Sequence, residues 1–229
     1  MLLRDKFVHI GNMESAGDVV ALSERLRGVM TVSLYDLTVR SYVQFMTSAL
    51  GCLEKGKTHY AAQGEDYTQL VGKSLHSDML PLHFQIVTMV HFSEAALAAA
   101  QSGVMGGPDM TLDMTYDELQ IYLAEARDRI ANLKPADINA LAGGEVVFKY
   151  GDVTLPFTTE DFFLTYALPS FYFHVTATYG ILRSLGVAVG IANYLGTVQT
   201  TPSAKIPDDV HQLTGEEYLK TLEPLAELK

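Results

Sequence analysis

The sequence predicts an all-α protein, an antiparallel four-helix bundle with one small β-hairpin between its third and fourth helices. Three observations support this fold class. Four long segments carry apolar residues at helical spacing, capping signals precede several of them, and one short stretch is rich in β-forming residues around a turn. With 229 residues, 48% of them hydrophobic, the chain can bury one substantial core.

The first two helices are predicted from apolar periodicity and from the residues that close them. The first spans Leu34 to Tyr60 and ends in a polar run. The second spans Leu82 to Ala100, with Ser77 as a possible N-cap, and the glycine-rich stretch 103–108 closes it. These two segments account for half of the expected bundle.

The third and fourth helices are predicted from capping boxes. Thr115 is followed three residues later by Glu118, ahead of an apolar pattern that continues to position 133. Thr158 and Asp161 repeat this spacing at the start of the fourth helix, which runs to about position 185. We expect Pro169 to kink this helix or to start a second segment within it.

A β-hairpin is predicted between the third and fourth helices. Two runs of β-forming residues, 145–150 and 153–157, flank the pair Gly151 and Asp152. Such a dipeptide suits a tight hairpin turn, because glycine readily adopts a positive φ. No internal repeat or low-complexity tract interrupts this arrangement.

Charge and cysteine content argue against several classes of partner and compartment. The net charge of -11 would repel phosphate backbones and anionic lipid, so we expect neither nucleic acid nor a membrane as partner. The uncharged stretch 162–182 is long enough to span a bilayer, but Pro169 and His174 interrupt it. The single cysteine, Cys52, excludes an internal disulfide, and the first twenty residues lack the pattern of a targeting signal, so we expect a cytoplasmic protein.

The fourth helix carries the most informative polar residue of the chain. His174 lies in an aromatic, uncharged segment, and a buried imidazole costs free energy unless its ring nitrogens find partners. It is therefore either a hydrogen-bonded core residue or part of a site. Tyr166, Tyr172 and Tyr179 recur at helical spacing in the same segment and either line a pocket or belong to the core.

Three sequence motifs resemble a known family. These are SLYDLTVRSYVQFM from position 33, SDMLPLHFQI from position 77 and TYALPSFYFHVTATYGILRSLGV from position 165. From residue 33 to about residue 196 the chain resembles an uncharacterised domain family, common in bacteria and fungi, of the DinB/YfiT-like helical bundles. The resemblance implies the bundle fold and leaves the activity open.

The resemblance also raises the possibility of a metal site. DinB-like relatives bind a divalent metal through one histidine on the second helix and two histidines spaced four apart on the last. Here the residue four positions after His174 is Thr178. His83 and His91 are eight residues apart, about 12 Å along a helix, so they cannot easily share one ion. We expect no metal; the alternative is zinc, nickel or iron held by His174 with His83 or His91.

These observations lead to three hypotheses of function. The leading one is a small-molecule enzyme or binder whose pocket lies inside the bundle and which uses metal-independent acid–base chemistry of the isomerase, cyclase or dehydratase type. The alternatives are a divalent-metal-dependent transferase or hydrolase and a noncatalytic dimeric interaction protein. Catalytic roles are predicted for His174, Tyr172 and Tyr179, and ligand-binding roles for His83, His91, Tyr166, Thr178 and Tyr35.

The domain organisation expected from the sequence has three parts. Residues 1–32 form an N-terminal extension and residues 33–196 the bundle domain. Residues 197–229 form an acidic, proline-containing tail packed on the bundle.

Overall fold

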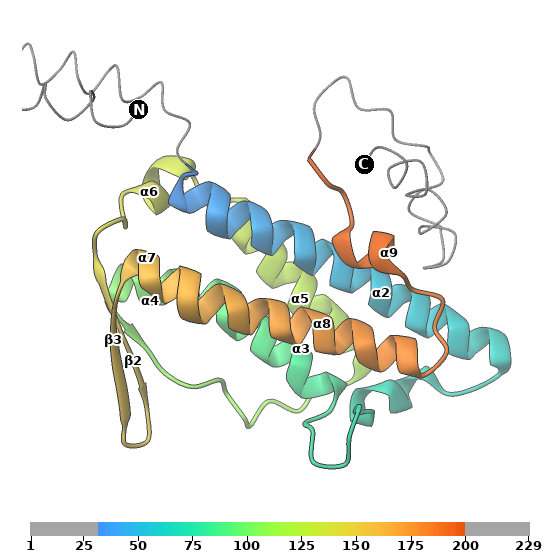
Figure 1. Ribbon diagram of the computed structural model, residues 1–229. Helices are drawn as coiled ribbons and strands as arrows, with labels where there is room; N and C mark the ends of the chain where they lie inside the picture. Colours follow the sequence, from blue (N-terminus) through green and yellow to red (C-terminus); the bar gives the residue numbers. More distant parts are fainter. Residues whose placement is uncertain (1–31, 200–229) are drawn as a thin grey trace, which may run out of the picture. The chain divides into compact units, whose positions relative to one another are not determined.

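The computed structural model describes residues 32–199, which are predominantly helical and carry one small sheet (Figure 1). The mostly helical class is therefore confirmed. The N-terminal extension and the C-terminal tail expected from the sequence lie outside the described residues, apart from residue 32 and residues 197–199. The helices and strands, with η marking π- or 3₁₀-helical segments, are η3 (Asp36–Arg40), α2 (Ser41–Gln63), η4 (Tyr67–Gly72), α3 (Leu82–Val90), η5 (His91–Ala95), α4 (Ala96–Ser102), β1 (Val104–Met105), α5 (Tyr116–Ala131), α6 (Pro135–Asn139), β2 (Glu145–Tyr150), β3 (Val153–Thr158), α7 (Thr159–Asp161), η6 (Phe162–Ala167), α8 (Leu168–Ser184) and α9 (Ile191–Leu195).

Helices α3 and α8 pack against each other in opposite directions. Near the start of α3, Gln85 bonds to His174 close to the middle of α8. Further along, Phe92 contacts Tyr166, which precedes α8. This helix pair carries the histidine that the sequence singled out.

Helices α2 and α8 run in the same direction. Tyr42 near the start of α2 packs edge-on against Phe171, and Gly56 near its end approaches Leu182. At the closest point, a side-chain carbon of Leu182 lies 3.0 Å from where a Cβ of Gly56 would stand. A Cβ at this position would require the Leu182 side chain to shift, so glycine lets the two helices approach closely.

Helices α3 and α5 also run in the same direction. His83 bonds to Met114, just before α5, and Glu94 pairs with Arg129 near its end. The chain must therefore return along the bundle between α4 and α5, and residues 103–115 do so beside α3 (Figure 1). We call residues 103–115 the crossover segment.

The strands of the described part form one three-stranded sheet in the order β1, β2, β3. Strands β2 and β3 are antiparallel, with Tyr150 opposite Val153, and the turn between them places Gly151 at a φ of 55°. Strand β1, at the start of the crossover segment, pairs with β2 in parallel. This third strand was not expected, because two residues after a helix carry no recognisable strand pattern.

Three of the long helical runs contain a π-helical segment, namely η3, η5 and η6. Such a segment adds one residue to a turn and rotates the residues that follow it relative to an ideal α-helix. The second segment expected at Pro169 is present, because η6 ends at Ala167 and α8 begins at Leu168 with the proline in its first turn. Ala167 and Leu168 keep right-handed helical dihedrals, so the backbone changes from π to α just before the proline, which has no N–H to donate.

The core lies where α2, α3, α5 and α8 meet. Among its fully buried side chains are Leu53, Tyr116 and Phe171. The Tyr116 hydroxyl donates to the Leu53 carbonyl oxygen at 2.7 Å, which joins α5 to α2. No helix within residues 32–199 is both long and apolar enough to cross a membrane.

Candidate functional site

His174 is the centre of the candidate site. Its side chain is buried, with 8% of the residue exposed. Its Nδ1 lies 2.8 Å from Oε1 of Gln85, while Nε2 of the same amide donates to the Leu80 carbonyl oxygen at 2.7 Å. The Gln85 oxygen can only accept, so Nδ1 of His174 carries the proton and donates it. In the neutral ring, Nε2 is then unprotonated.

The surroundings of His174 keep the ring neutral. Burial and, to a smaller extent, the nearby imidazole of His91 together lower its pKa from 6.5 to about 4. Nε2 therefore keeps its lone pair at neutral pH. The hydroxyl of Thr178 donates to the main-chain oxygen of His174 at 2.9 Å.

Three phenylalanines surround the imidazole. Phe92 stacks on it at 5.9 Å with an interplanar angle of 10°, and Phe84 and Phe173 meet it edge-on at 5.8 and 5.2 Å. The Phe92 ring also lies 5.2 Å from His91 and 5.5 Å from Tyr166. Phe92 thus brings together three of the predicted site residues.

Gln85 and Phe92 belong to this centre, and neither is among the residues predicted from the sequence to form a site. Gln85 is a buried amide within the apolar run of α3. Like His174, it is a polar group in an apolar helix that needs a partner. Phe92 carries no such signal, since one phenylalanine among several is not distinctive.

His83 and His91 both hold the crossover segment. Nε2 of His83 accepts the backbone N–H of Met114 at 3.1 Å. Nε2 of His91 donates to the carbonyl oxygen of Gly106, also at 3.1 Å, and burial lowers the pKa of His91. The two histidines therefore attach the crossover segment to α3 and η5 at two points.

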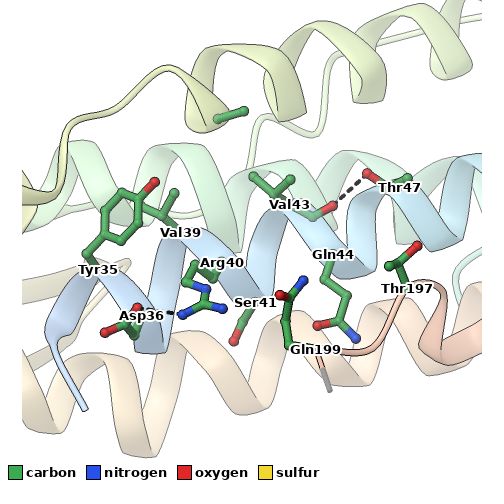
Figure 2. Close-up of a pocket in the computed structure, with 11 residues that line it drawn as sticks. Tyr35, Asp36, Val39, Arg40, Ser41, Val43, Gln44, Thr47, Thr197 and Gln199 are labelled. Carbon is green, nitrogen blue, oxygen red and sulfur yellow. Dashed lines mark hydrogen bonds and ion pairs between the residues drawn. The ribbon is translucent and has the colours of Figure 1, made fainter. Parts of the chain in front are cut away.

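The other predicted residues lie away from His174. Tyr172 packs edge-on against Phe45 of α2 at 5.1 Å, and Tyr179 packs against Tyr194 of α9 at 5.8 Å. Both therefore face a different side of α8 from the imidazole. Tyr35 lines a separate cavity at the start of α2 (Figure 2).

Three cavities can be placed within the described residues. The Tyr35 cavity, about 530 Å³, also contains the ion pair between Asp36 and Arg40, at 3.0 Å (Figure 2). A cavity of about 380 Å³ lies between α4, α5 and α6, and a third of about 420 Å³ is lined by His91. We call the third the His91 cavity. His174 lines none of these three, so the intra-bundle pocket expected around it stays a prediction.

The residues present do not fit the metal site implied by the DinB-like resemblance. The second histidine of the last helix is replaced by Thr178, and the Nε2 atoms of His83 and His91 are engaged with the crossover segment. Within residues 32–199, no group of three or more histidine, cysteine, aspartate or glutamate side chains is arranged to hold a metal ion.

Comparisons with known proteins agree with this fold. Residues 34–195 match the model of a family described as "Domain of unknown function (DUF1993)". The crystal structure of a DinB family member protein from Shewanella denitrificans is similar, with a TM-score of 0.62 and 25% sequence identity, over 76% of this chain and 96% of that chain. The comparison with curated proteins found no match. The chain belongs to the DUF1993 family of domains, and its fold is that of the DinB-like group.

Proposed function

We propose that the protein binds or converts a small, largely apolar metabolite at His174 by acid–base chemistry that needs no metal. The site would lie in a four-helix bundle built from α2, α3 with α4, α5, and α8. One observation carries the proposal. His174 is neutral, its Nδ1–H is held by Gln85, and Nε2 keeps a lone pair among aromatic rings.

The chemistry follows from this arrangement. The hydrogen bond to Gln85 fixes both the tautomer and the orientation of the His174 ring. Nε2 can therefore accept a proton or a hydrogen bond without a change of tautomer. A pKa of about 4 makes it a weak base, suited to an O–H donor or to an acidified C–H beside a carbonyl. Isomerisation, cyclisation and dehydration all require such a step.

The surrounding side chains support an apolar ligand. Phe173, adjacent to His174 in sequence, is 61% exposed, and Phe84 is half-buried. The imidazole therefore lies beneath an aromatic rim at the surface between α3 and α8. A ligand would reach Nε2 by displacing one of these rings, and its apolar part would take the place of that ring.

Histidine-ring NMR with a fragment screen tests the proposal. The ring nitrogens of His174 should show the Nδ1–H tautomer at pH 7. Small apolar alcohols and ketones that bind should shift its Nε2 resonance. The variant His174→Gln should lose this binding, whereas His83→Gln, on the other side of α3, should retain it. Binding that survives unchanged in a folded His174→Gln protein would remove the basis of the proposal.

A noncatalytic role in self-association is favoured by a different observation. Leu164 and Phe173 near and within α8, and Val153 and Leu155 on β3, are large apolar residues that are exposed. Residues of this kind are typical of contact surfaces where they form one contiguous patch. Sedimentation velocity tests this alternative: a dimer that Phe173→Ser dissociates would support it, and a monomer at high protein concentration would contradict it.

A further inference from the structure

We propose that the His91 cavity binds a small organic amine, with the ammonium group at Glu94 and Asp109 and the apolar body against α3, η5 and α4. This proposal does not rest on the function proposed for His174. The ligand class follows from the position of the cavity, from the chemistry of its wall and from its size.

The cavity lies beneath the crossover segment. Helical residues from α3 to α4 form its floor, the crossover segment contributes Asp109 and Leu112, and α5 contributes Tyr122. Apolar side chains make up most of the wall: Val87, Val90, Ala95, Ala98 and Leu112. An aliphatic or aromatic body would be buried against them.

The polar groups in this wall are mainly hydrogen-bond acceptors. His91 donates through Nε2 to Gly106, and burial lowers its pKa, so Nδ1 is left as an acceptor on a neutral ring. Glu94 and Asp109 contribute carboxylates, and no lysine or arginine is among the lining residues. A ligand group that forms hydrogen bonds with these acceptors must be a hydrogen-bond donor, as an ammonium group is.

The two carboxylates have different partners. The hydroxyl of Thr111 at 2.6 Å and its backbone N–H at 2.9 Å both donate to Asp109 and keep the pKa of that carboxyl below its ordinary value. Glu94 is paired with Arg129 at 2.5 and 3.0 Å, which leaves other lone pairs of its oxygens free. The cavity thus contains one compensated and one uncompensated negative charge.

Charges of both signs act on the Tyr122 hydroxyl. Burial raises its pKa, Glu94 raises it further, Arg129 lowers it, and Asp109 makes the smallest contribution and raises it. The negative charges therefore act on the part of the wall that Tyr122 forms. A cation is attracted there, and the face of a tyrosine ring adds a favourable contact to it.

The size of the cavity sets the scale of the ligand. Its volume of about 420 Å³ lies at the lower end of the range for small-molecule sites. An aromatic monoamine of about ten non-hydrogen atoms suits it, and we expect a dissociation constant of about 1 mM for an unoptimised probe of this size. 2-Phenylethylamine, protonated at neutral pH, and its neutral counterpart 2-phenylethanol form a matched pair of probes.

Titration of the full-length protein with both probes, followed by NMR, tests the proposal. The amine should shift the His91 and Tyr122 resonances and bind more tightly than the alcohol. Asp109→Asn keeps an oxygen that can accept from Thr111 and removes the charge, so it should weaken amine binding by about three- to tenfold and leave the alcohol unaffected. Asp113→Asn, an exposed neighbour outside the cavity wall, is the charge-matched control and should change neither.

The outcomes separate this proposal from the function proposed for His174. Amine binding that persists in His174→Gln and weakens in Asp109→Asn supports the amine site, whether or not His174 has its own ligand. Equal affinity for the amine and the alcohol would overturn the assigned ligand class. Absence of shifts at His91 and Tyr122, or equal weakening in Asp109→Asn and Asp113→Asn, would overturn the site itself.

Discussion

Replacing His174 with glutamine should make the free energy of unfolding less sensitive to acid. In the folded protein the ring is buried and lies near the imidazole of His91, and both conditions oppose a second proton. In the unfolded chain the same ring is in water and protonates readily. The glutamine side chain does not titrate, and its amide can still donate to Gln85.

The sign and size of the effect follow from the two pKa values. The pKa is 6.5 for the unfolded chain and about 4 in the folded protein. As pH falls below 6.5, the unfolded state gains a proton that the folded state does not, so stability falls. The loss is complete near pH 4 and amounts to about 3 kcal/mol, of which about 2.5 kcal/mol develops between pH 7.5 and pH 4.5. Above pH 6.5 the contribution is fully present.

Urea unfolding followed by far-UV circular dichroism measures this difference. The free energies of unfolding of the native protein and of His174→Gln are compared at half-unit steps from pH 7.5 to pH 4.5. Groups that are common to both proteins cancel in the difference, so the change with pH isolates position 174. A constant offset between the two curves reports the lost packing of the ring and has no bearing on the titration.

Two results would refute this reasoning. Parallel stability curves would mean that the imidazole titrates alike in the folded and unfolded chains. A curve for the native protein that falls less steeply with acid than that of His174→Gln would mean that the folded protein stabilises the charged ring. Histidine-ring NMR on the folded protein measures the pKa of His174 in the folded state directly and decides between these explanations.

Three further predictions concern helix packing, the crossover segment and the cysteine. Gly51→Ala, at a helical site with open space, should raise the free energy of unfolding, measured with urea, by about 1 kcal/mol. The Cβ of Gly56→Ala would lie 3.0 Å from the Leu182 side chain, so this variant should be less stable than Gly51→Ala by at least about 1 kcal/mol. Equal effects of the two substitutions would contradict the close helix contact. His83→Leu should speed amide hydrogen exchange at Met114 about tenfold, because that N–H loses its acceptor; unchanged exchange would mean that another group holds it. Cys52 should resist alkylation by iodoacetamide at pH 7.5 in the folded protein, because burial raises its pKa to about 11; rapid labelling without unfolding would contradict that environment.

The periodicity of the sequence was sufficient to locate the long helices. The capping box at Thr115 marks the start of α5 in the structure, and Thr158 marks the start of α7 as an N-cap that accepts the backbone N–H of Asp161. Periodicity could not reveal the π segments, because one inserted residue changes the phase of a helix without changing its composition. The short strand β1 was also out of reach, since its pairing with β2 depends on the path of the crossover segment.

The candidate site was predictable in part. His174 stands out in the sequence because a titratable group in an apolar helix is unusual. Its partner Gln85 lies 89 positions away, and only the antiparallel packing of α3 and α8 brings the two together. The positions of Tyr166, Tyr172 and Tyr179 were harder to predict, because residues at helical spacing share a face only while the helix keeps one phase. Tyr166 lies in the π-helical segment η6, whereas Tyr172 and Tyr179 lie in α8.

The separation of His83 and His91 explains both why they suit a metal poorly and why a cavity exists beside them. Eight helical residues place their attachment points about 12 Å apart along the axis, whereas the eight residues from Gly106 to Met114 can extend to about 27 Å. The crossover segment is therefore longer than the distance it bridges. The turn that Asp109 makes with Thr111 takes up part of that excess length, and Asp109 is one of the residues that line the His91 cavity. The same spacing that separates the two histidines thus leaves room for a ligand beneath the segment they hold.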